Sequence, residues 1–93
     1  MLTLDAVAIR IIQEQALVIG PMAWSEASKV EGLRIVNQSS AQITLEGDQK
    51  QIIDRLVAQY ERLFGRASHE VCKEAVAGML TQLREDEIPS SLR

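Results

Sequence analysis

The stretch GDQKQIIDRLVAQYERLFG, residues 47–65, has the clearest helical pattern in the chain. Apolar side chains recur in it every three or four residues, at Ile52, Ile53, Leu56, Val57, Tyr60, Leu63 and Phe64. This spacing predicts an amphipathic helix over residues 49–64. Asp48, followed three residues later by Gln51, has the form of a capping box, and Gly65 ends the helix.

A second segment with the same periodicity begins near the N-terminus. Its apolar positions are Leu4, Val7, Ala8, Ile11, Ile12, Val18 and Ile19. Gly20 and Pro21 break this helix, because glycine takes the left-handed position after a helix and proline suits the first position of the next. We expect a shorter helix from Pro21 to about Val30, with Ala23, Ala27 and Val30 on one face, ended by Gly32.

The pattern between residues 33 and 46 is that of a β-hairpin. Residues 33–36 are short and rich in β-branched side chains, and residues 41–46 alternate, with Ala41, Ile43 and Leu45 on one face. The polar sequence Asn-Gln-Ser-Ser at 37–40 lies between them as a turn. Gly47 closes the hairpin before the helix of residues 49–64 begins.

A fourth helix is expected after Gly65, capped by Ser68 and running to about Arg84. Its apolar stripe consists of Val71, Cys72, Ala75, Val76, Met79 and Leu83. Residues 1–88 then form a single small α+β domain, mostly helical, in the order α-α-β-β-α-α. Residues 89–93 form a C-terminal tail that either docks or frays.

The two helical halves align when the chain is shifted by 45 residues. Gly20 then meets Gly65, and the apolar positions of residues 7–19 meet those of residues 52–64. Either the halves are an internal repeat, two helical hairpins flanking the β-hairpin, or helical periodicity alone produces the match.

The composition limits which cellular compartment and which class of protein fit this chain. The chain has 93 residues, a net charge of −3 and 46% hydrophobic residues, which is typical of one soluble globular domain. Its single cysteine, Cys72, fits a reducing cytosol. The N-terminus lacks the basic region of a signal peptide, and no apolar run, that of residues 16–19 included, exceeds four residues, far too few to span a membrane. We therefore expect a cytoplasmic protein that does not enter the membrane.

The residues that could carry chemistry do not form a catalytic pattern. His69, the only histidine, lies near the start of the fourth helix, where we expect it to be exposed, without partners at metal-binding spacing. Cys72 lies on the apolar stripe, where a cysteine acts as a small hydrophobic residue. The acidic run at 85–87 is typical of a solvated helix end. The sequence thus indicates no catalytic residues, no metal and no cofactor, and the protein is not expected to be an enzyme.

One alternative is a nucleic-acid-binding regulator. Residues 49–84 form a helix-Gly-helix segment, and Arg66, His69 and Lys73 would lie on the helix that enters the groove. Glu70 and Glu74 share that helix, and the net negative charge opposes phosphate binding, so nucleic acid is not favoured.

The turn Ile19-Gly20-Pro21-Met22-Ala23, between two amphipathic helices, resembles a segment of small helical accessory domains in bacterial signalling proteins. Those domains contain an Ile-Gly-Pro-x-Ala turn and are appended to kinases and regulators. The resemblance covers about residues 8–30 and implies a role in protein interactions rather than in catalysis.

The leading expectation is a non-enzymatic protein-interaction module, regulatory or adaptor in kind and related to bacterial signalling. It would act as a homodimer, since a short β-hairpin has unpaired edges that a second copy could satisfy. The interaction residues expected near the Gly-Pro break and on the hairpin are Met22, Trp24, Ser25, Ile35 and Ile43. A lone tryptophan such as Trp24 is by default a core residue. If Trp24 is partly exposed instead, it would be a binding anchor. A further alternative is an accessory subunit or a small-ligand binder between the two helical hairpins.

Overall fold

A computed structural model describes residues 2–93 and confirms the α+β class and the order of elements. The elements are α1 (Leu4–Ile19), α2 (Met22–Ala27), β1 (Leu33–Asn37), β2 (Gln42–Leu45), α3 (Gln49–Phe64), α4 (Arg66–Leu80) and two 3₁₀ turns, η1 (Glu85–Glu87) and η2 (Ser90–Leu92).

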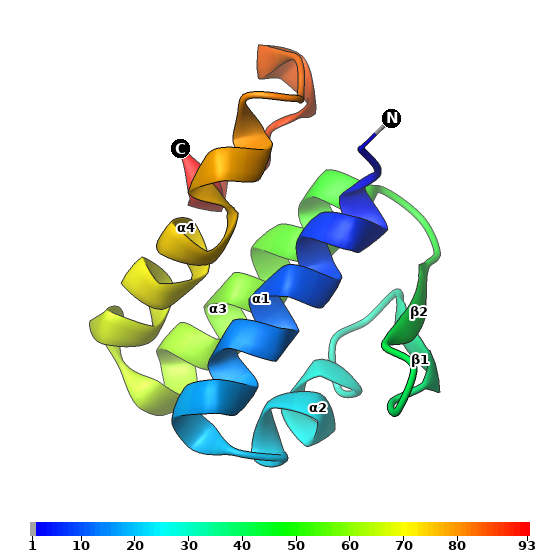
Figure 1. Ribbon diagram of the computed structural model, residues 1–93, viewed down its shortest axis with the longest axis vertical. Coiled ribbons are helices and arrows are strands. Elements are labelled where there is room, and N and C mark those ends of the chain that lie inside the picture. The colour runs from blue at the N-terminus through cyan, green and yellow to red at the C-terminus, as the bar shows by residue number, and fades with distance from the viewer. Residues whose placement is uncertain (1) are drawn as a thin grey trace.

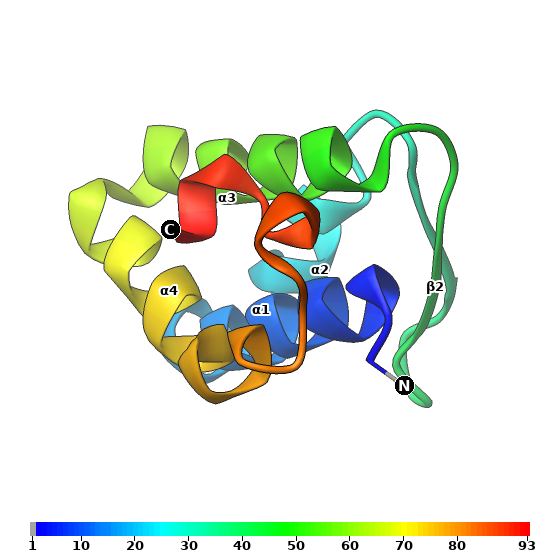
Figure 2. The same ribbon diagram turned by 90° about the horizontal axis from the view of Figure 1, so that it is seen from above.

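The helices form two layers. Helix α1 packs against α2, α3 and α4, and in Figure 1 it lies in front of α3, running in nearly the same direction, with α4 to its left. Seen from above in Figure 2, α3 forms one layer and α1 with α4 forms the other. The hairpin covers one end of this stack, where β2 contacts α1. A two-stranded sheet alone is only marginally stable, and packing against α1 adds the apolar contacts that stabilise it.

The core consists mainly of aliphatic side chains from α1 and α3. The buried positions of α1 are Val7, Ala8, Ile11, Ile12 and Gln15, and those of α3 are Ile52, Ile53, Leu56, Val57 and Tyr60. Each residue of the second set lies 45 positions after a residue of the first. The two helices also begin and end 45 residues apart, and both end at a glycine with positive φ, Gly20 or Gly65.

Two buried hydrogen bonds connect the halves in a reciprocal way. The Gln15 amide on α1 donates to the carbonyl oxygen of Ser68 at 2.9 Å, and the Tyr60 hydroxyl on α3 donates to the carbonyl oxygen of Ala23 at 2.6 Å. Gln15 and Tyr60 correspond at the offset of 45, and so do Ala23 and Ser68. Each long helix is therefore bonded to the shorter helix of the opposite half, as in an exchange across a two-fold axis.

The second helices of the two halves differ in length. The internal repeat therefore remains a prediction for the halves as whole units. Helix α2 has 6 residues and α4 has 15. The predicted end of α2 at Val30 is wrong: after Ala27 the chain continues in tight turns, with the Val30 amide bonded to the Ala27 carbonyl.

The predicted limits of α4 are also wrong at both ends. The helix begins at Arg66 directly after Gly65, so Ser68 lies inside the first turn and caps nothing. It ends at Leu80 rather than at Arg84, because the next amides bond three residues back, Gln82 to Met79 and Leu83 to Leu80. The predicted cap of α3 is confirmed, since Asp48 accepts hydrogen bonds from the amides of Lys50 and Gln51.

The β-hairpin is antiparallel, as predicted. Leu33 pairs with Leu45 and Ile35 with Ile43, and a register shift follows between Ile35 and Asn37. Ala41, which ends the turn, has a φ of 54°. The alternation places Ile43 in the core, facing inward from β2.

The C-terminal segment is docked. Pro89 and Leu92 are buried, and η2 packs on both α3 and α4. In Figure 2 this segment, drawn in red, lies between those two helices. Over residues 2–93, none of the helices is long and apolar enough to cross a lipid bilayer.

Gly32 is the position where the fold depends on glycine. Its φ is +91°, and a β-carbon there would lie 2.7 Å from Cδ1 of Ile52 and 2.8 Å from the carbonyl oxygen of Glu46. We predict that Gly32→Ala lowers the free energy of unfolding by about 2–4 kcal/mol, from backbone strain plus overpacking.

Gly65→Ala is the matched control, because its φ is +87° but nothing lies within 4 Å of the added carbon. It should cost only the backbone term, about 1–3 kcal/mol, because its φ of 87° and ψ of −176° lie in a region that residues other than glycine rarely adopt. Urea denaturation compares the two variants. Equal losses would contradict the role assigned to the close contact between Gly32, Ile52 and Glu46.

Candidate functional site

The most exposed apolar side chains lie at the C-terminal end of α1. Leu17 is 81% exposed and Val18 is 65% exposed, whereas the opposite side of the same helix is fully buried. Met22, at the start of α2, is half exposed. Leu17 and Val18 are large aliphatic residues on consecutive positions, so they form an apolar projection rather than scattered surface residues.

A groove runs between α1 and α4 beside this projection. Its larger part has a volume of about 580 Å³ and is lined by Ala6, Ile9, Arg10, Gln13, Glu74, Ala75, Gly78 and Met79. A smaller part, of about 390 Å³, continues along Leu17, Val18 and Val71. On α4 the floor consists of the small residues Ala75 and Gly78, which let a side chain from outside approach the helix closely. We call the groove and the projection together the α1/α4 face.

Charges of both signs border the α1/α4 face. Arg10 forms an ion pair with Glu14 one turn later on α1, at 3.0 Å, and Glu74 lies across the groove on α4. The arrangement can accept a partner surface of mixed charge, and it does not form the basic surface that phosphates require.

The interaction residues predicted from the sequence do not form one surface. Met22 and Ser25 are exposed, and Ile35 is partly buried. Trp24, at 8% exposure, and Ile43, at 7%, belong to the core, so their placement on an exposed contact surface is wrong. The alternative interpretation of Trp24 as a core residue is confirmed. Both side chains point inward because α2 and β2 pack on the long helices.

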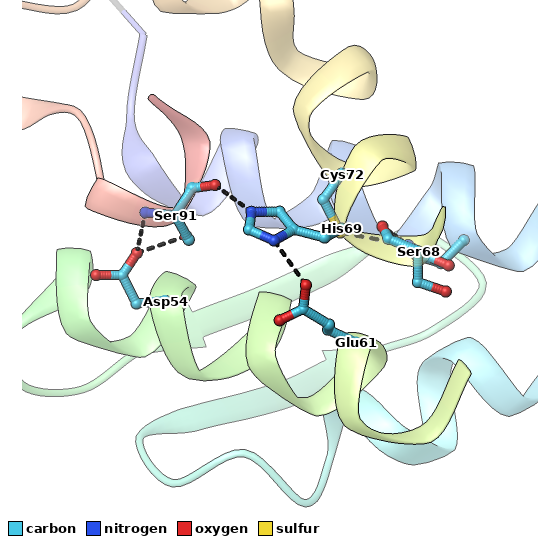
Figure 3. A network of polar contacts seen from close by, with 7 residues as sticks. Asp54, Glu61, Ser68, His69, Cys72 and Ser91 are labelled. Atoms are coloured by element: carbon cyan, nitrogen blue, oxygen red, sulfur yellow. Dashed lines mark hydrogen bonds and ion pairs between the residues drawn. The ribbon is translucent and has the colours of Figure 1, made fainter. Parts of the chain in front are cut away.

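A second cluster, of polar groups, joins α3, α4 and the C-terminal segment (Figure 3). Nδ1 of His69 lies 2.9 Å from a carboxylate oxygen of Glu61, and its Nε2 lies 2.6 Å from the carbonyl oxygen of Ser91. The Asp54 carboxylate accepts hydrogen bonds from the amide and the hydroxyl of Ser91 and from the hydroxyl of Ser90. We call this set the His69 clamp.

The expectation that His69 is exposed is wrong, since these contacts leave its side chain 28% exposed. The hydrogen bond to the Ser91 carbonyl, and then the one to Glu61, raise the pKa of His69 above its usual 6.5. Of the residues suggested for nucleic-acid binding, Arg66 is exposed and Lys73 is partly buried, but His69 already has partners on both ring nitrogens.

Cys72 lies in the core, as predicted. Burial raises the pKa of its thiol to about 11, and the Gln15 amide donates to its sulfur at 3.3 Å. A neutral, buried thiol is a poor nucleophile. The described part of the chain contains no cluster of three or more His, Cys, Asp or Glu side chains placed to hold a metal ion.

Comparisons with known proteins do not assign the chain to a group, since no family model, no curated protein and no solved structure matches it.

Sequence reasoning missed the α1/α4 face and the clamp. A signal for the first was present: residues 16–19 are four consecutive apolar residues, and a helix that turns by about 100° per residue cannot direct all four into one core. The clamp had no local signal, because Asp54, His69 and Ser91 lie far apart in the sequence.

Burial of Cys72 gives a direct prediction for labelling. At pH 8 a thiol with a pKa near 11 has about a hundredth of the thiolate of an ordinary cysteine, and the surrounding core also excludes the reagent. Iodoacetamide should therefore modify the folded protein at least about a hundredfold more slowly than the protein in urea, as measured by mass spectrometry. Comparable rates in the two conditions would contradict a closed core at this position.

Proposed function

We propose that the protein is a non-enzymatic protein-interaction module that associates with a second copy of itself through the α1/α4 face. The observation that carries this proposal is the exposure of Leu17 and Val18 beside an open groove. Burial of such side chains gives roughly 1.5–3 kcal/mol each, and a two-fold interface buries each of them twice, which offsets the cost of association.

The charges favour a second copy as the partner. A two-fold interface requires a self-complementary surface, in which residue i of one copy contacts residue j of the other and the reverse contact also occurs. Arg10 on α1 and Glu74 on α4 border the same groove, so each can face the other across such an interface twice. A partner of uniform charge would meet repulsion from one of them.

The hairpin edge is the other surface expected to mediate a homodimer. Among the large apolar residues of the hairpin, Val36 is the most exposed, whereas Ile43 is buried in the core. This surface offers fewer apolar side chains than the α1/α4 face, and we therefore place the interface on the helices.

The resemblance of residues 19–23 to accessory domains of bacterial signalling proteins supports a regulatory or adaptor role for the module. The burial of Cys72 and the engagement of His69 also favour interaction over catalysis. A cytoplasmic location agrees with the free thiol of Cys72, which a reducing compartment preserves.

Light scattering during size-exclusion chromatography, over a range of concentrations, tests the proposal with two matched variants. Val18→Glu puts a charge on the α1/α4 face, and Val36→Glu puts the same charge on the hairpin at a position of similar exposure, 59% against 65%. The wild-type protein and Val36→Glu should show twice the mass of the 10.3 kDa chain. Val18→Glu should weaken the dimer about a hundredfold, because a two-fold interface contains the substitution twice.

Dissociation by Val36→Glu but not by Val18→Glu would move the interface to the hairpin and overturn the assignment to α1 and α4. A wild-type chain that stays monomeric at all concentrations would overturn self-association. Circular dichroism of each variant checks that the fold is retained.

A further inference from the structure

The C-terminal segment, residues 89–93, is held on α3 and α4 as a separate ligand would be. Pro89 and Leu92 insert their side chains into the core, three residues apart. Between them, Ser91 is bound through its main chain at both ends. Its amide donates to Asp54 at 3.0 Å, and its carbonyl oxygen faces His69 at 2.6 Å. Side chains of α3 and α4 thus hold the backbone of the segment (Figure 3).

The connection between α4 and this segment is loosely attached. Most side chains of residues 81–88 are exposed, and its only helical element is the single turn η1. The segment can therefore leave its seat without unfolding the four helices, because the connecting residues are held mainly by the partly buried Leu83 and by an exposed hydrogen bond from Lys50 to the Asp86 carbonyl.

His69 is the part of the clamp whose bonding depends on a proton. Both of its ring nitrogens face oxygen atoms that only accept hydrogen bonds, the Glu61 carboxylate and the Ser91 carbonyl. A neutral imidazole has one N–H group and can satisfy only one of these acceptors, whereas the imidazolium form satisfies both. The geometry therefore selects the doubly protonated ring.

The carboxylates near His69 act in the same direction, while the cations Arg66 and Lys73 lie about one turn before and after it on α4. Glu61 faces it from α3, Glu70 is its neighbour on α4, and Asp54 lies behind Ser91 on the other side of the segment. Cys72, one turn further on α4, is a neutral thiol. The carboxylates of Glu61 and Glu70 and the carbonyl dipole of Ser91 thus stabilise the positive ring, and burial opposes it only partly, since the side chain is 28% exposed.

We propose that residues 89–93 form a latch on α3 and α4 that is closed most firmly when His69 is doubly protonated and opens more often when His69 loses that proton. This regulation is independent of the proposed dimer. An open latch uncovers the apolar seat of Pro89 and Leu92 between the two helices.

The direction of the pH dependence follows from linkage. The pKa of His69 is higher in the closed latch than in a free side chain, whose value is 6.5. The extra stability is therefore complete below the pKa of the open form and is lost as the pH rises through that of the closed form. The ratio of the closing constants at low and high pH equals ten to the power of the difference between the two pKa values.

Two measurements on the full chain test this relation independently. Because His69 is the only histidine, one imidazole resonance in an NMR titration gives its pKa. Leu92→Asp, which expels the segment from its seat, supplies the value for the open latch, and Asp54→Asn serves the same purpose without adding a buried charge. The wild-type pKa should exceed that of both variants, while Trp24 fluorescence reports that the core is intact.

Hydrogen exchange then measures opening at the Ser91 and Leu92 amides, which bond to Asp54 and to the Pro89 carbonyl. Their protection, corrected for the intrinsic exchange rate, should fall between about pH 5 and about pH 9 by the factor that the pKa difference gives. His69→Gln retains an N–H donor that does not titrate and should abolish the pH dependence. Glu70→Gln, which leaves both acceptors in place, should retain it.

Protection of Leu92 that is independent of pH in the wild type would overturn the proposal, because the proton would then stabilise only the contact between His69 and Glu61. An unchanged pH dependence in His69→Gln would overturn it as well, since another group would control the latch.

Discussion

The pair of hydrogen bonds exchanged between the two halves constrains the rest of the structure. Gln15 and Tyr60 are fully buried, and a buried polar group without a partner destabilises a fold by about 1–3 kcal/mol. Their partners are the carbonyl oxygens of Ser68 and Ala23, in the first turns of α4 and α2. These bonds fix where each short helix starts against the opposite long helix. They thereby set which faces of α1 and α4 remain outside.

Helix α4 connects the two functional proposals. Its outer side contributes Glu74, Ala75 and Gly78 to the α1/α4 face, and its side toward α3 contributes His69 to the clamp. Figure 2 shows the C-terminal segment, in red, between α3 and α4, whereas the groove is lined by residues of α1 and α4. The interface and the latch thus occupy different surfaces and can operate without steric conflict. Both surfaces belong to the same packed helix, which is anchored near its start through the Ser68 carbonyl.

Much of the fold could be predicted from the sequence, because its signals are local. The limits of α1 and α3 follow from helical periodicity and glycine breaks, and the hairpin follows from alternation around a polar turn. The sequence of α1 by itself gives no sign that Gln15 is buried, because the neighbouring Gln13 and Glu14 are also polar. The offset of 45 pairs it with Tyr60, a member of the apolar stripe of α3. The candidate sites were harder to predict, because helical periodicity groups Val18 with the buried apolar positions of α1, whereas its side chain is 65% exposed. The clamp joins residues from three separate segments through tertiary packing alone.

The central claim is that the exchanged hydrogen bonds make the two halves one cooperative unit. Native-state hydrogen exchange of Tyr60→Phe against the wild type tests it most directly. The variant loses one of the two bonds, and the free energy of opening should fall by about 1 kcal/mol. If the halves depend on each other, the buried amides of α1 and α3 should lose this protection equally, since they open together. Loss of protection confined to α2 and α3, with α1 unchanged, would contradict the account.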